Sequence, residues 1–166
     1  MRLVTIDTSF LASNGQVRAG VSRPEVAVLL GEHLFVLVCA EFQAEIQTRI
    51  KALNDASANN APWVRAAVER QVGYCFGGPQ EKRGSASLGQ IRNFCKFLGQ
   101  GCRDDFELLL AADNQAMVSY ESLFNNRNNI AHGGQRAVTL RDALTYYWSG
   151  HRVVDYLLQA VGPYLA

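Results

Sequence analysis

Apolar residues recur at helical spacing through one long stretch of the chain. They are Val26, Leu29, Leu30, Leu34, Leu37, Val38, Phe42, Ile46, Ile50 and Leu53. Steps of three and four residues place side chains on one face of an α-helix. The run Ser22-Arg23-Pro24-Glu25 is a typical helix start, so we predict a helix from there to about Asn54. It would be roughly 45 Å long at 1.5 Å per residue, and would serve as the spine of a bundle or as a dimerisation element.

Shorter segments with the same periodicity follow. Helices are predicted over residues 63–76, 87–98, 115–131 and 139–161, and a further helical segment starts near Phe106 and breaks near Asp113 and Asn114. Ser87 and Thr139 are expected caps, with Asp142 completing a variant capping box after Thr139. The sequence shows no alternating strand pattern and no internal repeat. It therefore predicts an all-α bundle of about five helices with a long first helix, formed by residues 22–166 as a single domain, and an N-terminal extension, residues 1–21, whose structure the pattern does not determine.

Composition limits the class of protein. The chain has 166 residues, of which 48% are apolar and 19% charged, and its net charge is +1. These values exclude a disordered chain and a polycationic nucleic-acid binder. Charge is nevertheless uneven, because Lys82, Arg83, Arg92, Lys96 and Arg103 have no acidic residue among them. This segment predicts either a modest phosphate-binding patch or a solvated face whose carboxylates come from elsewhere.

The four cysteines, Cys39, Cys75, Cys95 and Cys102, show no CxxC pair and no histidine at metal-ligand spacing. We expect reduced thiols, with Cys39 packed as a small apolar residue, and no structural zinc or other cofactor. The chain has no signal-peptide pattern, and its most apolar stretch, 26–40, is too short to span a bilayer. We expect a soluble cytoplasmic protein without a membrane partner.

The most unusual run of the sequence is Asn125-Asn126-Arg127-Asn128-Asn129-Ile130-Ala131-His132-Gly133-Gly134. Asparagine is a poor helix former, so four of them in a predicted helix break local consistency, as functional sites often do. Arg127 and His132 are five residues apart, which separates them by about 140° on a continuous helix. They can converge only if the helix ends between them, and Gly133-Gly134 supplies the stop signal.

The segment from Arg127 to Gly133 resembles the Arg-polar-x3-His motif of the HEPN superfamily, in particular the RNxxAHG form of the bacterial RiboL-PSP-type HEPN nucleases. The remainder resembles these proteins only in architecture. The resemblance implies a HEPN-like bundle, metal-independent endoribonuclease activity on RNA, and a homodimer that joins two motifs. It also implies the role of a toxin, with a possible antitoxin protein as partner, or of a phage-defence effector.

The residue types of this segment also suit RNA cleavage on chemical grounds, apart from the resemblance. RNA is cleaved when a 2′-OH attacks the adjacent phosphate, which needs a base, an acid and positive charge near the phosphorane. His132 can transfer protons, Arg127 can bind phosphate through two hydrogen bonds, and Asn128 can orient the imidazole or bind a phosphate oxygen. One histidine does not easily act as base and acid in one step, so two apposed motifs would complete the site.

Other interpretations stay open. His132 could interact with the helix dipole while Arg127 pairs with a carboxylate such as Glu121. The domain could bind RNA, a nucleotide or a protein through Arg127 and His132 without turnover, or act as a helical adaptor through the long helix.

Further residues have two interpretations each. Glu41 and Glu45, one turn apart, are an acid–base or metal-ligand candidate, although an exposed helix face is favoured. His33 and His151 are interpreted as satisfied core or surface histidines, and Ser85 and Ser87 as turn and cap residues. For five aromatic residues helical spacing favours packing over base stacking: Trp63, Trp148, Tyr146, Tyr147 and Tyr156. No Walker or dinucleotide-binding motif occurs.

Overall fold

The computed structural model describes residues 24–57, 61–77, 85–131 and 140–165. In these ranges the chain forms six helices: α2 (Pro24–Ala56), α3 (Pro62–Phe76), α4 (Leu88–Leu98), α5 (Gln100–Ala112), α6 (Asn114–Ala131) and α7 (Leu140–Leu165). The described ranges contain no β-strand. The predicted all-α architecture with a long first helix is therefore confirmed.

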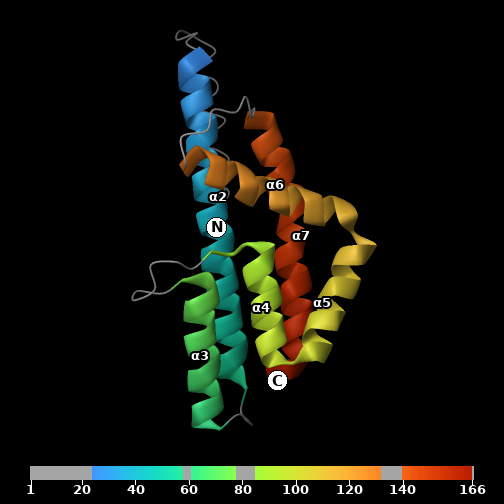
Figure 1. The fold of residues 1–166 in the computed structure, drawn as a ribbon. Helices are drawn as coiled ribbons and strands as arrows, with labels where there is room; N and C mark the ends of the chain where they lie inside the picture. Colours follow the sequence, from blue (N-terminus) through green and yellow to red (C-terminus); the bar gives the residue numbers. More distant parts are fainter. Residues whose placement is uncertain (1–23, 58–60, 78–84, 132–139, 166) are drawn as a thin grey trace.

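Two long helices form the spine of the bundle, as Figure 1 shows. α2 has 33 residues and packs along α7, which has 26. α3 lies beside the C-terminal part of α2, and α4 and α5 pack against α7. α6 crosses both spine helices, and the N-terminal part of α2 extends beyond the level of α3, α4 and α5 (Figure 1). This crossing brings the predicted site region to the middle of α2.

Aromatic side chains hold the three central helices together. The Phe42 ring on α2 stacks on Tyr120 of α6, with ring centroids 5.5 Å apart, and on Tyr147 of α7, at 5.3 Å. The Tyr120 hydroxyl donates a hydrogen bond to the carbonyl oxygen of Ala86, although the ring is fully buried. Burial of large apolar rings is the main favourable term in such a core. The predicted stripe forms the core face at Leu34, Val38, Phe42, Ile46 and Ile50, but Leu37, also predicted for it, is exposed.

A glycine permits the close crossing of α6 and α7. A Cβ atom built on Gly150 would lie 3.2 Å from both the Cα and the N of Tyr120. These are backbone atoms, which cannot move aside without shifting the helix. Gly150 is thus the point where α7 lets α6 approach.

The α5–α6 junction explains why the structure has six helices where about five were expected. Asp113 separates α5 from α6, and its Oδ1 accepts a hydrogen bond from the Ala116 amide at 3.2 Å, so it caps α6. Its Oδ2 also accepts from the Tyr156 hydroxyl at 2.7 Å and pairs with Arg152 at 2.9 Å. The break predicted near Asp113 is real, and the segment before it is a helix in its own right, starting at Gln100.

The helix ends mostly agree with the predicted bounds. Ser87 occupies the cap position of α4, but its side chain makes no capping hydrogen bond, and Ser85 Oγ instead accepts from the Ser87 amide at 3.3 Å. The last helix was expected to end near Val161, yet α7 continues past Pro163 to Leu165. Leu165 is buried, and this burial stabilises the extra turn. The predicted caps Ser22 and Thr139, and the extension 1–21, lie outside the described residues.

Candidate functional site

The C-terminal end of α6 carries the residues of the predicted site. α6 stays helical through all four asparagines and ends at Ala131. Asn126 is buried, and its side-chain amide donates to the carbonyl oxygen of Ser122 at 2.8 Å. This intrahelical hydrogen bond compensates for the low helix propensity of asparagine. The helix thus carries Arg127 and Asn128 in regular geometry.

Arg127 is half-buried, and its guanidinium donates from Nη1 to Asn128 Oδ1 at 3.2 Å. Within the described ranges it forms no ion pair with a carboxylate. The pairing with Glu121 that sequence reasoning left open is therefore absent. A guanidinium whose only described partner is a neutral amide keeps most of its donors for an anion.

Arg127 also lies close to the buried Cys39 thiol of α2. Burial raises the pKa of Cys39 to about 12, and the positive charge of Arg127 lowers it in part. Cys39 is therefore a protonated, apolar packing residue, as predicted, and it is no nucleophile at neutral pH. Its influence on the Cys39 thiol places Arg127 on the side of α6 that faces α2.

His132 lies outside the described residues. Ala131 is the last described residue of α6, so whether the helix ends between Arg127 and His132, as their convergence requires, stays a prediction. The convergence of guanidinium and imidazole stays a prediction. Of the three predicted site residues, the structure brings together Arg127 and Asn128.

Glu45 belongs to an ion-pair cluster and does not face Glu41 as a free carboxylate. Glu45 Oε2 is 2.9 Å from His151 Nε2 on α7, and Glu45 Oε1 accepts from Arg49 at 3.1 Å. Arg49 also pairs with Asp155 at 3.2 Å, and Asp155 is 3.6 Å from His151 Nδ1. The cluster links α2 to α7 through groups that all have partners. An acid–base role for Glu45 is not supported.

Sequence reasoning missed this cluster. Its signal was present, because Glu45 and Arg49, like His151 and Asp155, are spaced four residues apart on a helix. The sequence could not predict that α2 packs against α7 and so brings these two pairs together. His151 is a satisfied histidine as interpreted, with its ring edge against Phe42 at 5.8 Å. His33 is exposed and also has a partner.

The aromatic candidates divide into two groups. Tyr147 is buried, and Tyr146 and Tyr156 pack against the core, as predicted. The packing interpretation is wrong for Trp63 and Trp148, whose exposed fractions are 74% and 64%. Helical spacing indicated a buried face, but both indoles lie on the outer side of their helices.

In the basic segment that ends at Arg103, the two described arginines share one carboxylate. Arg92 binds Glu107 through two hydrogen bonds, Nε to Oε1 at 2.7 Å and Nη2 to Oε2 at 3.2 Å. Arg103 is 3.9 Å from the same carboxylate. Lys96 is exposed, and Lys82 and Arg83 lie outside the described residues. For Arg92 and Arg103 the second interpretation therefore holds, because a carboxylate from outside the segment pairs with them.

No group of three histidine, cysteine or carboxylate side chains in the described ranges is arranged to hold a metal ion. All four cysteines are free and buried. None of the described helices is long and apolar enough to cross a bilayer.

With this geometry established, comparison with known families gives a match over residues 8–162, nearly the whole chain. The matching family is RiboL-PSP-HEPN. The chain belongs to it. Searches of curated proteins and of solved structures give no significant match. Membership in RiboL-PSP-HEPN agrees with the all-α bundle and makes this chain a HEPN-type module of RNA-related function.

Proposed function

We propose that this protein is a metal-independent endoribonuclease that cleaves RNA by attack of a 2′-OH on the adjacent phosphate. The observation that carries the proposal is Arg127, a guanidinium at the end of α6 with no carboxylate partner among the described residues. Family membership supports the substrate class. Arg127 binds the phosphate, and His132 transfers the proton. Asn128 orients the imidazole or binds a phosphate oxygen.

The reaction balances without a cofactor. The imidazole of His132 takes the proton of the 2′-OH while the oxygen forms a new bond to phosphorus. The bond from phosphorus to the 5′-oxygen breaks, and that oxygen takes a proton from a general acid. Arg127 neutralises charge on the non-bridging oxygens as the phosphorane forms. The products are a 2′,3′-cyclic phosphate and a 5′-hydroxyl end.

A homodimer would supply the general acid, as the imidazole of the second copy. Two copies related by a two-fold axis contribute the same surface, so a dimer apposing two α6 ends would provide two imidazoles and two guanidiniums. Large apolar side chains exposed on the spine helices support such an interface. They are Val36 and Leu37 on α2 and Trp148 on α7. Cleavage activity should then fall on dilution in parallel with the dimer fraction measured by analytical ultracentrifugation.

The test is RNA cleavage in excess EDTA, with analysis of the product ends. Wild-type protein should yield cyclic phosphates, and His132→Ala should lose cleavage while circular dichroism and melting stay unchanged. His33→Ala, a histidine exposed on α2, is the matched control and should cleave normally. Cleavage retained by His132→Ala would refute the role of this residue.

The biological role we propose is that of a toxin or a phage-defence effector, with an antitoxin protein as possible partner. It is supported by membership in RiboL-PSP-HEPN alone. Induced expression should arrest bacterial growth, and His132→Ala should relieve the arrest at equal protein level. Arrest that persists with the variant would separate the cellular effect from RNA cleavage.

A non-catalytic binding module is the alternative. The exposed indoles of Trp63 and Trp148 favour it, since such rings can stack on bases without any chemistry. A binding module would form a stoichiometric complex with RNA and leave the RNA intact over hours. Intact RNA recovered from a saturated wild-type complex would establish this alternative over the nuclease.

A further inference from the structure

A groove between α2 and α3 is separate from the candidate site. It has a volume of about 250 Å³ and is lined by Gln47, Lys51, Asn54, Val68, Glu69, Val72, Gly73 and Gly77. Lys51 follows Cys39 by twelve residues, which is about 18 Å along α2 from the level of Arg127. Binding cavities for small molecules start near 300 Å³, so this groove suits a ligand of few atoms.

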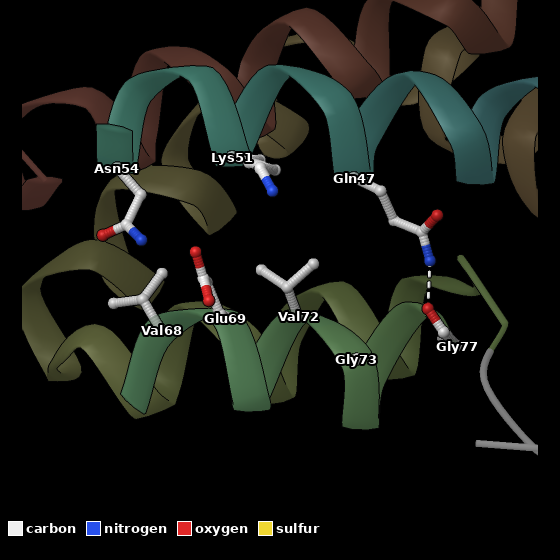
Figure 2. A pocket seen from close by; sticks show the side chains of 8 residues that line it. All are labelled: Gln47, Lys51, Asn54, Val68, Glu69, Val72, Gly73 and Gly77. Atoms are coloured by element: carbon white, nitrogen blue, oxygen red, sulfur yellow. Dashed lines mark hydrogen bonds between the residues drawn. The ribbon is translucent and has the colours of Figure 1, made fainter. Parts of the chain in front are cut away.

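Opposite charges face one another across the groove. Figure 2 shows the Lys51 ammonium pointing from α2 toward α3 and the Glu69 carboxylate pointing from α3 toward α2. Over the part of the chain that the structure describes, neither group takes part in an ion pair. A cation and an anion held apart beside a cavity can each bind the opposite charge of one ligand.

Beyond the charges, the two ends of the groove differ. At one end Asn54 is fully buried, and its Nδ2 donates to the Arg65 carbonyl oxygen at 3.2 Å. Its Oδ1 is buried, accepts no hydrogen bond from the described residues and points away from Glu69 (Figure 2), so the acceptor at this end of the groove is the Glu69 carboxylate. A carboxylate accepts charge-assisted hydrogen bonds, so this end favours a ligand that brings N–H groups.

The other end is small and apolar. Val72 points into the groove, and a Cβ atom added to Gly73 would meet nothing within 4 Å. The Gln47 amide is already used, since its Nε2 donates to the carbonyl oxygens of Phe76 and Gly77. Open space over Val72 and Gly73 therefore suits an aliphatic group.

We propose that the groove between α2 and α3 binds a small aliphatic α-amino acid as its zwitterion. The ligand carboxylate pairs with Lys51, its ammonium group donates to Glu69 at the Asn54 end, and its side chain packs on Val72 and Gly73. Each part of the groove thus has one complementary part of the ligand. This inference is independent of RNA cleavage.

The test is titration of the full-length protein, observed by ¹H–¹⁵N correlation spectroscopy, with three probes that share the same isobutyl group. L-leucine carries both charges, 4-methylpentanoate lacks the ammonium group, and 3-methylbutylamine lacks the carboxylate. Leucine should shift the amide signals of groove residues at millimolar concentration, and each singly charged probe should bind at least about tenfold more weakly. No groove shift with leucine, or equal affinity for a singly charged probe, would overturn the proposal.

Variants locate the site. Gly73→Leu should fill the apolar end and abolish binding, and Lys51→Met should weaken it about tenfold or more. Gly89→Leu and Lys96→Met make the same changes on α4, outside the groove, and should bind leucine like wild type. Binding that survives Gly73→Leu in a folded protein would show that leucine binds elsewhere, and would equally overturn the proposal.

Discussion

Two regions of this bundle hold arginines in opposite ways. On the α4–α5 face, Arg92 and Arg103 gather around the Glu107 carboxylate, and Arg92 binds both of its oxygens. At the end of α6, Arg127 has a neighbouring amide oxygen as its only hydrogen-bond acceptor among the described residues. The residue type is the same in both regions. We call the first region closed because its arginines pair with a carboxylate, and the second open because Arg127 has no carboxylate partner among the described residues.

An arginine that pairs with a carboxylate stabilises the fold, whereas an arginine without such a partner has its charge available for a ligand. A guanidinium already bound to a carboxylate must break that pair before it can bind phosphate. Arg127 has only its hydrogen bond to Asn128 Oδ1 to break among the described contacts. Its neighbour on α2, Cys39, stays neutral because burial raises the pKa of its thiol. The open region therefore presents a positive charge that no described carboxylate neutralises.

The largest expected effect concerns how α6 is held. Packing, and not charge, fixes this helix at Gly150 of α7, so Gly150→Leu should lower the free energy of unfolding by about 1–3 kcal/mol. Gly162→Leu, on the same helix with open space around it, is the matched control and should not destabilise. Urea denaturation measures both, and an equal loss in the two variants would contradict this account of the crossing.

The next effect concerns the start of α6. Tyr156, the Ala116 amide and Arg152 together lower the pKa of Asp113 below 3.8, against the opposing effect of burial. A depressed carboxyl pKa gives stability above the unfolded-state pKa, and this stability is lost as pH falls through the folded value. Asp113→Asn, which keeps a capping oxygen, should therefore be less stable than wild type at pH 7 and approach it below about pH 4. A difference that grows on acidification would contradict the shift.

The smallest expected effect is on the stability contributions of the two arginines, Arg92 and Arg127. Arg92 and Glu107 are about one-third exposed, so a double-mutant cycle on the pair should give a coupling free energy of roughly 0.2–1 kcal/mol. Arg127→Ala should change the free energy of unfolding by less than that, because no carboxylate is left behind. A stability loss from Arg127→Ala larger than from Arg92→Ala would make Arg127 the structural residue of the two.

Local sequence patterns predicted most of the fold. The periodicity from Val26 to Leu53 indicated the long helix, and the break predicted near Asp113 separates α5 from α6. These features act over one or two turns, so they can be recognised without knowing the neighbours. The last turn of α7 lies beyond the predicted end near Val161, because burial of Leu165 stabilises the helix past Pro163.

Contacts between helices were the part that sequence could not predict. Arg92 and Glu107 lie on successive helices, and Glu45 and His151 are more than one hundred residues apart. The exposure of Trp148 depends on which helices cover α7, and periodicity carries no such information. The motif at Arg127 was the opposite case, because residue types unsuited to a helix marked the region directly.

The central claim is that the open guanidinium acts in catalysis and the closed one does not. The measurement is the rate of RNA cleavage in EDTA by Arg127→Ala beside Arg92→Ala, with both variants shown to be folded. Loss of a preorganised charge contact to the transition state should slow Arg127→Ala by about 10²–10³-fold, and Arg92→Ala should cleave at nearly the wild-type rate. Equal rates for the two variants, or a greater loss in Arg92→Ala, would contradict the account.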